Sequence, residues 1–562
     1  MKTTTAAVDA PDACIPQSKR SLAHWGSLLG VLAIAALLRF WSLASKPLWL
    51  DEIATALFGF GRGYNDIPID TLFDPAQLPE LLRWQAGVSC PEIGALLAEQ
   101  STHPPLFFCS LYGWLAGADL TSVWQLRALP AFLGVVAVGA VYGLGRLAFS
   151  PQAGLWAAVV MAVSPFGMYL SQEARQYTLL SILVAVAVGC TISLTSVRTR
   201  QGWWQIPLWL LWAGVNSFGC YVHYFFAIVL AAQLAILLVA SWRRPDRLLS
   251  LCLATVAIVM SYWPWLPVAI AHFSSPKTSW LPEPQGLTPL VQLLVSWVVT
   301  IAFLPVEKQS LPIKIVSALA MLAAVAFVCW TAIRQWRQAW PQWLPWQQRN
   351  GAILVGFVGL AITQFLGIVY ILGKDITVAP RYNYAYFPVF CILLGIVLAL
   401  PSQAARRSRW VVVAVGVASA LCINANLVFK KPFLPGLVAE QLNASKAPLL
   451  VAVAADDSLE LALGVSYLLA LNDRRDPALV TQAVFLDRSN NYGQVWQRFA
   501  SLDTEAADLW AVAPHLRRVD FPDTLQLGSD RTCEIDPDGH YRIGGYPYQH
   551  YRCRTQATKT FR

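Results

Sequence analysis

Three short polar clusters hold the side chains of this chain that could do chemistry. They are Asp51-Glu52, the turn His103-Pro104-Pro105-Leu106 and the run Gln172-Glu173-Ala174-Arg175-Gln176-Tyr177. A carboxylate can take a proton from a hydroxyl, and a guanidinium can bind phosphate oxygens through a bidentate fork. All three clusters interrupt apolar sequence, and a charged group at the membrane centre costs about 2.5–3.5 kcal/mol on insertion scales. Such groups therefore lie at the membrane surface or serve a function.

The composition is that of a polytopic membrane protein. Of the 562 residues, 56% are hydrophobic and only 13% are charged, and 24 are tryptophans. An apolar run of about 20 residues crosses the hydrocarbon core, and tryptophan is enriched at its interfaces. The formal net charge of +9 is spread in short tufts between apolar runs. This pattern indicates membrane topology and argues against a nucleic-acid partner.

Clear apolar runs predict about eleven spans. They cover residues 22–43, 127–148, 153–171, 177–197, 203–222, 223–241, 248–270, 313–333, 350–372, 383–401 and 410–429. The first is predicted to be a retained anchor, because basic residues precede it and no small-residue cleavage site follows. Two further runs, 105–118 and 289–305, are short or borderline for a crossing.

The basic tufts decide how the two ambiguous runs are read. If neither run crosses, the tufts all fall on one side, which the positive-inside rule makes the cytoplasm. If both cross, the middle of the protein inverts and five arginines move outside. We therefore expect both runs to be in-plane or re-entrant helices on the outer face. The polar clusters then share that face.

After the last span the composition becomes that of a soluble domain. Beta-like runs (448–454, 478–486, 508–512) alternate with helical runs (459–471, 494–502), which predicts a small α/β domain outside the membrane. There, Cys533 and Cys553 flank a hairpin-like segment and either form a disulfide or remain two unrelated thiols. The predicted division is a cytoplasmic tail at 1–21, a transmembrane module at 22–435 with a first outer loop of about 44–126, and a periplasmic domain at 436–562.

The strongest local signal is Pro47-Leu48-Trp49-Leu50-Asp51-Glu52, just outside the first span. On a non-periodic turn, adjacent carboxylates point in different directions, so Asp51 can face a substrate while Glu52 holds backbone or a cation. A carboxylate at an interface is suited to general base catalysis. The alternative is a solvated helix N-terminus, where the helix dipole favours acidic residues.

Three arginines, Arg127, Arg175 and Arg381, lie at predicted span ends on the outer side, where orientation does not require positive charge. Snorkelling or pairing with a glutamate explains any one of them. Three of them beside two carboxylates and two histidines indicate an anion site. Arginine suits phosphate because its planar fork matches the phosphate oxygens.

The other candidates are weaker when taken singly. His103 stands in a turn that two prolines make rigid. Glu173 and Tyr177 are four residues apart and share a helical face if the helix continues through both. His223 and Tyr382 each lie in an aromatic-rich motif beside a polar head, which is also typical of the aromatic belt.

Five motifs follow one another in a single order over roughly residues 22–400. They are Leu48-Trp49-Leu50-Asp51-Glu52, His103-Pro104-Pro105-Leu106, Arg127-Ala128-Leu129-Pro130-Ala131-Phe132-Leu133-Gly134, Ser171-Gln172-Glu173-Ala174-Arg175-Gln176-Tyr177 and Pro380-Arg381-Tyr382. The set resembles the GT-C glycosyltransferases, in particular the protein O-mannosyltransferase and aminoarabinose transferase branch with its bacterial family-39-like relatives. The resemblance implies a sugar donor on polyprenyl phosphate, a catalytic Asp in a large first outer loop, in-plane helices and inversion at the anomeric carbon.

The sequence thus predicts a mainly α-helical, polytopic membrane glycosyltransferase of the bacterial plasma membrane, with its site facing the periplasm. Asp51 would be the general base, and Glu52 would orient the loop or the acceptor. The predicted partners are a membrane lipid donor and a glycolipid, polysaccharide or protein acceptor; no obligate cofactor and no obligate metal is implied. The candidate donor-phosphate or substrate-binding residues are His103, Arg127, Glu173, Arg175, Tyr177, His223, Lys374, Arg381 and Tyr382.

The alternative class is a polytopic transporter or lipid flippase. Such a protein would place ionisable residues near the bilayer midplane and would show repeated halves. Neither feature is evident in this sequence.

Overall fold

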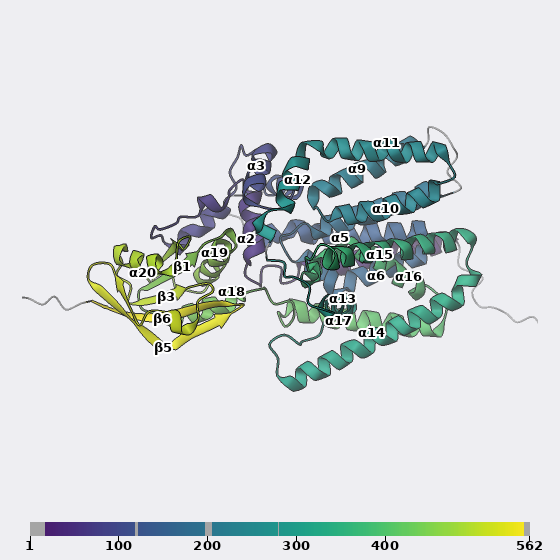
Figure 1. Ribbon diagram of the computed structural model, residues 1–562. Coiled ribbons are helices and arrows are strands. Elements are labelled where there is room, and N and C mark those ends of the chain that lie inside the picture. The colour runs from purple at the N-terminus through teal and green to yellow at the C-terminus, as the bar shows by residue number, and fades with distance from the viewer. Residues whose placement is uncertain (1–16, 119–121, 197–204, 279, 556–562) are drawn as a thin grey trace, which may run out of the picture.

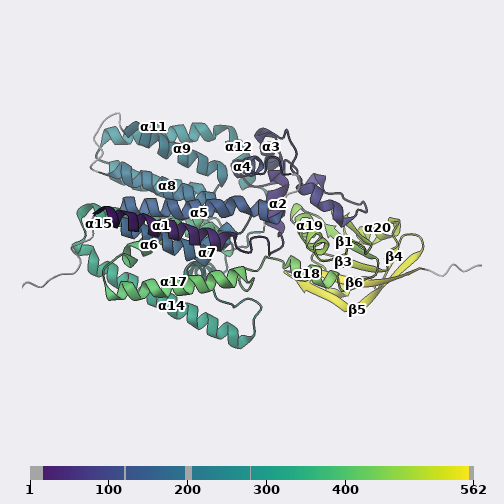
Figure 2. The ribbon, with the colours of Figure 1, turned by 180° about the vertical axis from the view of Figure 1, so that it is seen from behind.

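The computed structural model describes residues 17–118, 122–196, 205–278 and 280–555. A bundle of long helices forms one end of the molecule and a mixed sheet forms the other, with helices of the first outer loop between them (Figure 1). The view from behind shows the same division (Figure 2). Most of the predicted cytoplasmic tail, 1–21, lies outside the described residues.

Among the described residues, seven helices are long and apolar enough to cross a membrane, or up to eight if a bent pair counts as one. The seven are α1 (Gln17–Phe40), α5 (Val123–Ala148), α8 (Tyr177–Thr195), α11 (Pro245–Tyr262) continued by α12 (Leu266–Phe273), α14 (Leu311–Ala339), α15 (Pro345–Tyr370) and α17 (Gln403–Asn424), and the bent pair is α6 (Pro151–Val163) with α7 (Pro165–Ser171). The shorter apolar helices α9 (Ile206–Val222), α10 (Phe226–Ser241) and α16 (Phe387–Leu398) occupy the other predicted spans. Every predicted span coincides with helix, and the number of crossings stays a prediction.

The predicted span 153–171 is broken, because α6 and α7 are bent by 64°. Pro165 has no N–H to donate to the preceding turn. Arg39 of α1 donates instead to the carbonyls of Met161 and Ala162, at 2.9 and 3.0 Å. Its Nε also donates to Ser171 Oγ at 3.1 Å. This fully buried arginine, which the sequence did not single out, therefore holds the break together.

The two ambiguous runs contain short helices. The first contains α4 (Leu106–Trp114) with 9 residues and the second contains α13 (Thr288–Ile301) with 14. Both are shorter than the roughly 20 residues of a span. Because α9, α10 and α16 are also shorter, the in-plane placement of α4 and α13 stays a prediction. The first outer loop also forms α2 (Leu50–Gly59), η1 (Tyr64–Asp66), η2 (Pro75–Leu82) and α3 (Cys90–Gln100), and the disulfide Cys90–Cys109 joins α3 to α4.

The C-terminal part contains a six-stranded sheet in the order β2-β1-β3-β6-β5-β4. Its strands are β1 (Leu449–Ala455), β2 (Thr481–Asp487), β3 (Asp508–Val512), β4 (Thr524–Leu527), β5 (Arg531–Ile543) and β6 (Tyr546–Thr555). The parallel strands β1 to β3 are connected through α19 (Ser458–Asn472) and α20 (Tyr492–Arg498). We call this part the sheet domain, and it confirms the small α/β domain. Cys533 and Cys553 face each other across the β5–β6 hairpin and form a disulfide.

The sheet domain is joined to the outer loop at two places. Helix α19 packs against α2, and Ser466 Oγ donates to the carbonyl of Leu48 at 2.6 Å. Phe73 of the outer loop and Ala483 of the edge strand β2 exchange backbone hydrogen bonds of 3.0 and 2.8 Å. Helix α18 (Pro435–Leu442) leads from α17 into the domain, and the remaining short helices are η4 (Trp263–Trp265), η5 (Pro276–Thr278), η6 (Trp340–Gln342), η7 (Ile376–Val378), η8 (Pro380–Ala385), η9 (Phe499–Ser501) and η10 (Arg518–Asp520).

Candidate active site

Asp51 and Glu52 lie in the first turn of helix α2 and not on a non-periodic turn. The helix begins after the extended residue Trp49, and acidic residues are favoured there by the helix dipole. The turn is not solvated, because Glu52 is 0% exposed and the Asp51 side chain is 18% exposed. Neighbouring helical positions are about 100° apart. The two carboxylates therefore enter different surroundings.

Glu52 is held in a closed network of donors. Arg127 donates from Nε and Nη2 to the two carboxylate oxygens at 2.8 and 2.7 Å. Lys431 Nζ lies 3.1 Å from Oε2, and the Ala174 N–H donates to Oε1 at 2.9 Å. Burial alone would raise the pKa of Glu52, but Arg127 and Lys431 hold it below its usual range. Glu52 is therefore ionised and fully partnered.

Arg127 has no donor left for a ligand. Its Nη1 donates to the carbonyls of Leu43 and Lys46 at 2.9 and 2.8 Å, and its Nη2 also donates to Pro47 at 3.1 Å. Together with the fork on Glu52, these bonds use all five N–H groups of a guanidinium. The side chain is 1% exposed. Arg127 thus anchors the entry to α2, and the phosphate-binding role predicted for it does not fit this geometry.

Lys431 connects Glu52 to a second buried carboxylate. Its Nζ lies 3.1 Å from Glu173 Oε1, while Glu173 Oε2 is buried without a partner among the described residues. Glu173 does not share a helical face with Tyr177, because α7 ends at Ser171 and α8 begins at Tyr177. Sequence reasoning missed Lys431. The one sequence signal for Lys431 was the pair of lysines just after the last predicted span. They lie on the outer side, where the positive-inside rule requires no basic residue.

Asp51 faces two other arginines. Its Oδ2 lies 3.2 Å from Arg381 Nη2 and 3.8 Å from Arg175 Nη2. Arg175 Nη1 donates to the Asp51 carbonyl at 3.1 Å and to Thr55 Oγ1 at 2.9 Å, which fixes that guanidinium against α2. The Nε atoms of Arg175 and Arg381 are both buried without a partner among the described residues. This side of α2 therefore keeps unused donors beside a carboxylate.

Two histidines flank the arginines. His103 Nε2 lies 3.0 Å from Arg175 Nη2. Burial, and next the charge of Arg175, hold the pKa of His103 well below its usual value. The ring is therefore neutral, and Nε2 accepts, because a guanidinium can only donate. His223 lies 5.9 Å from His103 between ring centroids.

Aromatic rings form the wall of this cluster. The Arg381 guanidinium lies 5.6 Å from the ring centre of Trp49, 5.8 Å from that of Trp280 and 5.7 Å from that of Tyr382. Tyr177 lies 5.9 Å from His223 between ring centroids. A cation held on aromatic faces is fixed without using its hydrogen-bond donors.

Lys374 is placed apart from the other candidates. It donates to Thr278 Oγ1 at 2.9 Å and lies over the ring of Phe273. No contact joins it to Asp51 or to the arginines within the described residues. The structure thus brings together every other candidate from the sequence, in two connected groups around α2.

Unpartnered polar atoms concentrate around Asp51. Of the sixteen buried side-chain polar atoms without a hydrogen-bond partner in the described chain, ten belong to segments 49–51, 173–178 and 381–384. They include both amide atoms of Gln176 and the hydroxyl of Tyr384. Native proteins leave few buried polar groups unpaired. Such a concentration indicates a site for a polar ligand. No group of three metal-ligating side chains is found within the described residues.

Residues 102–266 match the family model for dolichyl-phosphate-mannose-protein mannosyltransferase. No curated protein sequence matches the chain. Among solved structures, apo ArnT from Cupriavidus metallidurans is similar with a TM-score of 0.52 and 12% identity, over 94% of this chain and 98% of that one. The same ArnT bound to undecaprenyl phosphate gives a TM-score of 0.50 at 12% identity, over 95% and 98%.

The family match over residues 102–266 and the similarity in fold to ArnT both agree with the resemblance to the GT-C glycosyltransferases. The chain is a multi-pass membrane protein with the ArnT-like arrangement of a helical bundle and a small C-terminal sheet domain. The resemblance and the fold class expected from the sequence are thereby confirmed. At 12% identity the likeness extends to the fold alone.

Proposed function

We propose that this protein moves a sugar from a polyprenyl-phosphate donor to a hydroxyl acceptor at the periplasmic face of the bacterial plasma membrane. The observation that carries the proposal is Asp51 beside Arg381 and Arg175, whose Nε donors are unused. This pairs a proton acceptor with groups that bind phosphate. ArnT, which has this fold, was solved with undecaprenyl phosphate, a lipid of the proposed donor class.

Asp51 is the proposed general base. The acceptor oxygen attacks the anomeric carbon from the face opposite the phosphate, forms the new C–O bond and passes its proton to the carboxylate. The bond from the anomeric carbon to the phosphate oxygen breaks, and its electron pair leaves with polyprenyl phosphate. One displacement of this kind inverts the configuration.

Arg381 and Arg175 are the proposed phosphate-binding residues. Negative charge grows on the phosphate as it leaves, and donors fixed in advance stabilise that charge most. Arg381 is held on three aromatic rings, and Arg175 is held by Thr55 and the Asp51 carbonyl. His103, His223, Tyr177 and Tyr382 surround the two guanidinium groups, so we assign them to binding and orientation.

Glu52 and Arg127 are proposed as positioning residues. Their network reaches Lys431 and Glu173 and ties the first turn of α2 to the loop between α7 and α8. That loop carries Arg175. The closed network therefore sets the distance between the general base and one of its phosphate-binding arginines.

The disulfides support a periplasmic site. Cys90–Cys109 and Cys533–Cys553 both lie in segments predicted to be outside, whereas the six free cysteines among the described residues all lie in predicted spans. Disulfides persist in the periplasm and are rare in the cytosol. They therefore favour the orientation in which Asp51 faces the periplasm.

The test is donor turnover by purified protein in lipid nanodiscs. Polyprenyl-phosphate hexoses and pentoses are offered one at a time with extracted envelope glycolipids, and released polyprenyl phosphate is quantified by mass spectrometry. We expect release from at least one donor, abolished in Asp51→Asn, and a product whose anomeric configuration by NMR is opposite to that of the donor. Turnover of nucleotide sugars in place of lipid-linked sugars, or retention of configuration, would contradict the proposal.

A further inference from the structure

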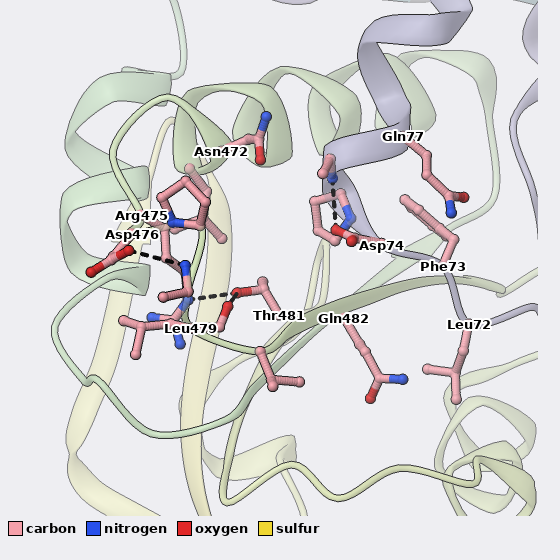
Figure 3. A pocket seen from close by; sticks show the side chains of 16 residues that line it. Leu72, Phe73, Asp74, Gln77, Asn472, Arg475, Asp476, Leu479, Thr481 and Gln482 are labelled. Carbon is pink, nitrogen blue, oxygen red and sulfur yellow. Dashed lines mark hydrogen bonds between the residues drawn. The ribbon is translucent and has the colours of Figure 1, made fainter.

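A ligand-sized cleft lies where the first outer loop meets the sheet domain. Its volume is about 580 Å³, within the range of roughly 300–1,000 Å³ usual for small-molecule sites. Residues 72–77 form one wall and residues 471–482 form the other (Figure 3). None of the residues assigned to the Asp51 site lines it.

The floor of the cleft is an open position on an edge strand. In the parallel β1–β2 pair, Leu449 donates to the carbonyl of Val480, so even-numbered residues of β2 pair with β1. The odd-numbered residues point outward, and Ala483 and Phe485 use those groups to bind the outer loop. Thr481 is next in this alternation. Its N–H and C=O therefore face the cleft, and no described residue pairs with them.

The walls supply further unused hydrogen-bonding groups. Gln77 and Asn472 are exposed amides without a partner among the described residues, and they come from opposite walls (Figure 3). Asp74 and Asp476 each cap a backbone N–H with Oδ1 and leave Oδ2 free. The cleft thus offers amide donors, carboxylate acceptors and a backbone pair within one hollow.

An anionic ligand does not suit this lining. Arg475 is the one cation among the lining residues, and it is only 6% exposed. Four of its five N–H donors are used on Thr481 Oγ1, on the Asn443 side chain and on the carbonyls of Ser445 and Ala447. Two exposed carboxylates remain without a facing cation. Phosphates and uronates are therefore disfavoured.

A peptide strand is also disfavoured as the occupant. Adding a strand to a sheet edge needs a row of free N–H and C=O groups. Here the outer loop already occupies the edge from Ala483 onward, and Leu479 donates its N–H to Asp476. Only the backbone N–H and C=O of Thr481 are left unpaired along the described part of this strand edge.

We propose that this cleft is a saccharide-binding site for neutral sugar residues, separate from the Asp51 site. Sugar hydroxyls both donate and accept, as do the amides and the Thr481 backbone. Phe73, the one aromatic ring of the lining, stacks on Phe485 with centroids 5.8 Å apart and adds an apolar side chain to the lining. The site would hold a glycan on the outer face while the sheet domain and outer loop stay docked.

The test measures binding to the full-length protein in nanodiscs, without any transfer reaction. Neutral glucan, mannan and galactan hexasaccharides are offered as probes in saturation-transfer difference NMR, with an oligogalacturonate as the anionic counterpart. We expect at least one neutral probe to bind with a Kd of about 1 mM and the anionic probe to bind more weakly. Absence of saturation transfer to every neutral probe would overturn the proposal.

Two variants locate the binding. Gln77→Ala with Asn472→Ala should weaken it about tenfold or more, because both amides are lost without creating a cavity. Asn490→Ala with Gln494→Ala is the matched control, since these exposed amides bond only to each other by their side chains and do not line the cleft. Equal weakening in the control, or unchanged binding in the cleft variant, would show that the sugar binds elsewhere. Because no turnover is measured, failure here leaves the donor chemistry at Asp51 untouched.

Discussion

Asp51 and Glu52 are adjacent in the chain and have the same chemistry, but α2 turns them into opposite environments. Glu52 is fully buried and receives hydrogen bonds from Arg127 and Ala174, with Lys431 within ion-pair distance. Asp51 is partly exposed and lies near two arginines that keep unused donors. A saturated network stabilises a structure, whereas an unsaturated one can bind something. Of these two neighbours in one helical turn, Glu52 therefore stabilises the structure, and Asp51 is the one placed to take part in chemistry.

The largest contrast is expected from removing each negative charge with a nearly isosteric amide. Asp51→Asn should lower turnover by about 10²–10⁴, the usual contribution of a general base, with normal yield and thermal stability. Donor-release assays and thermal unfolding of the purified protein in nanodiscs measure both. Wild-type turnover in Asp51→Asn would remove this residue from the mechanism.

Glu52→Gln should reverse that pattern. It leaves Arg127 as a buried cation without a carboxylate and leaves Lys431 with Glu173 alone, and breaking a buried pair costs about 3–5 kcal/mol. We expect a large loss of folded protein, measured as detergent-resistant yield and unfolding temperature. Lys431→Met added to Glu52→Gln should not recover the loss, because it also removes the cation that pairs with the buried Glu173 carboxylate. A stable but inactive Glu52→Gln protein would instead place Glu52 in the chemistry.

The sequence was sufficient to predict which segments meet. Apolar runs predicted the helices, basic clusters predicted that the polar motifs share one membrane side, and alternating short runs predicted β1 to β3 with their helices. Asp51, Arg175 and Arg381 were singled out because a charged residue beside a span needs an explanation, and His103 because two prolines fix its turn.

What the sequence did not reveal is which donors are already used. Arg127 and Arg381 have the same setting in sequence, each at the end of a predicted span. Glu52 takes two of the five donors of Arg127, and the path of residues 43–47 around it uses up the other three. Lys431 and Arg39 were missed for the same reason, since their partners lie more than a hundred residues away and are fixed by tertiary packing. Whether a polar group already has all its hydrogen-bond partners depends on the fold, so the sequence alone does not show it.

Arginine-to-lysine replacements on the Asp51 side and on the Glu52 side should give effects of intermediate size on turnover and stability. Arg381→Lys keeps the charge but loses the planar fork, so turnover should fall by about 10², the order seen for losing one preorganised donor, with stability little changed. Arg127→Lys should reduce stability more than intrinsic turnover, because several buried acceptors lose their donors. Lys374→Arg is the matched control and should alter neither. Equal turnover in Arg381→Lys and wild type would shift the phosphate role to Arg175 alone.

The smallest expected effect concerns a cluster of ionisable residues in the sheet domain. His550 bridges Asp508 and Asp536 at 3.1 Å each, and Arg552 also lies 3.1 Å from Asp536. Burial alone would lower the pKa of His550, but hydrogen bonds to the two aspartates raise it above 6.5. A raised pKa in the folded state means stabilisation that is complete below about 6.5 and is lost as the pH rises through the folded value.

Between pH 6.5 and 9, the unfolding temperature of the wild type should therefore fall by a few degrees relative to that of His550→Gln, in keeping with the roughly 1 kcal/mol or less of a partly exposed pair. The variant no longer titrates at this position and still donates one hydrogen bond. Lys46, whose pKa burial lowers to about 7, titrates in the same window but does so alike in both proteins. The window avoids two other effects. Asp508 and Asp536 have lowered pKa values and lose their contribution only in acid, and the lowered pKa of His540 acts below 6.5. The measurement is thermal unfolding of the full-length protein at each pH. If the unfolding temperature of His550→Gln changes with pH as it does in the wild type, the His550 bridge adds no pH-dependent stability. Its role would then be structural only, like that of the network around Glu52.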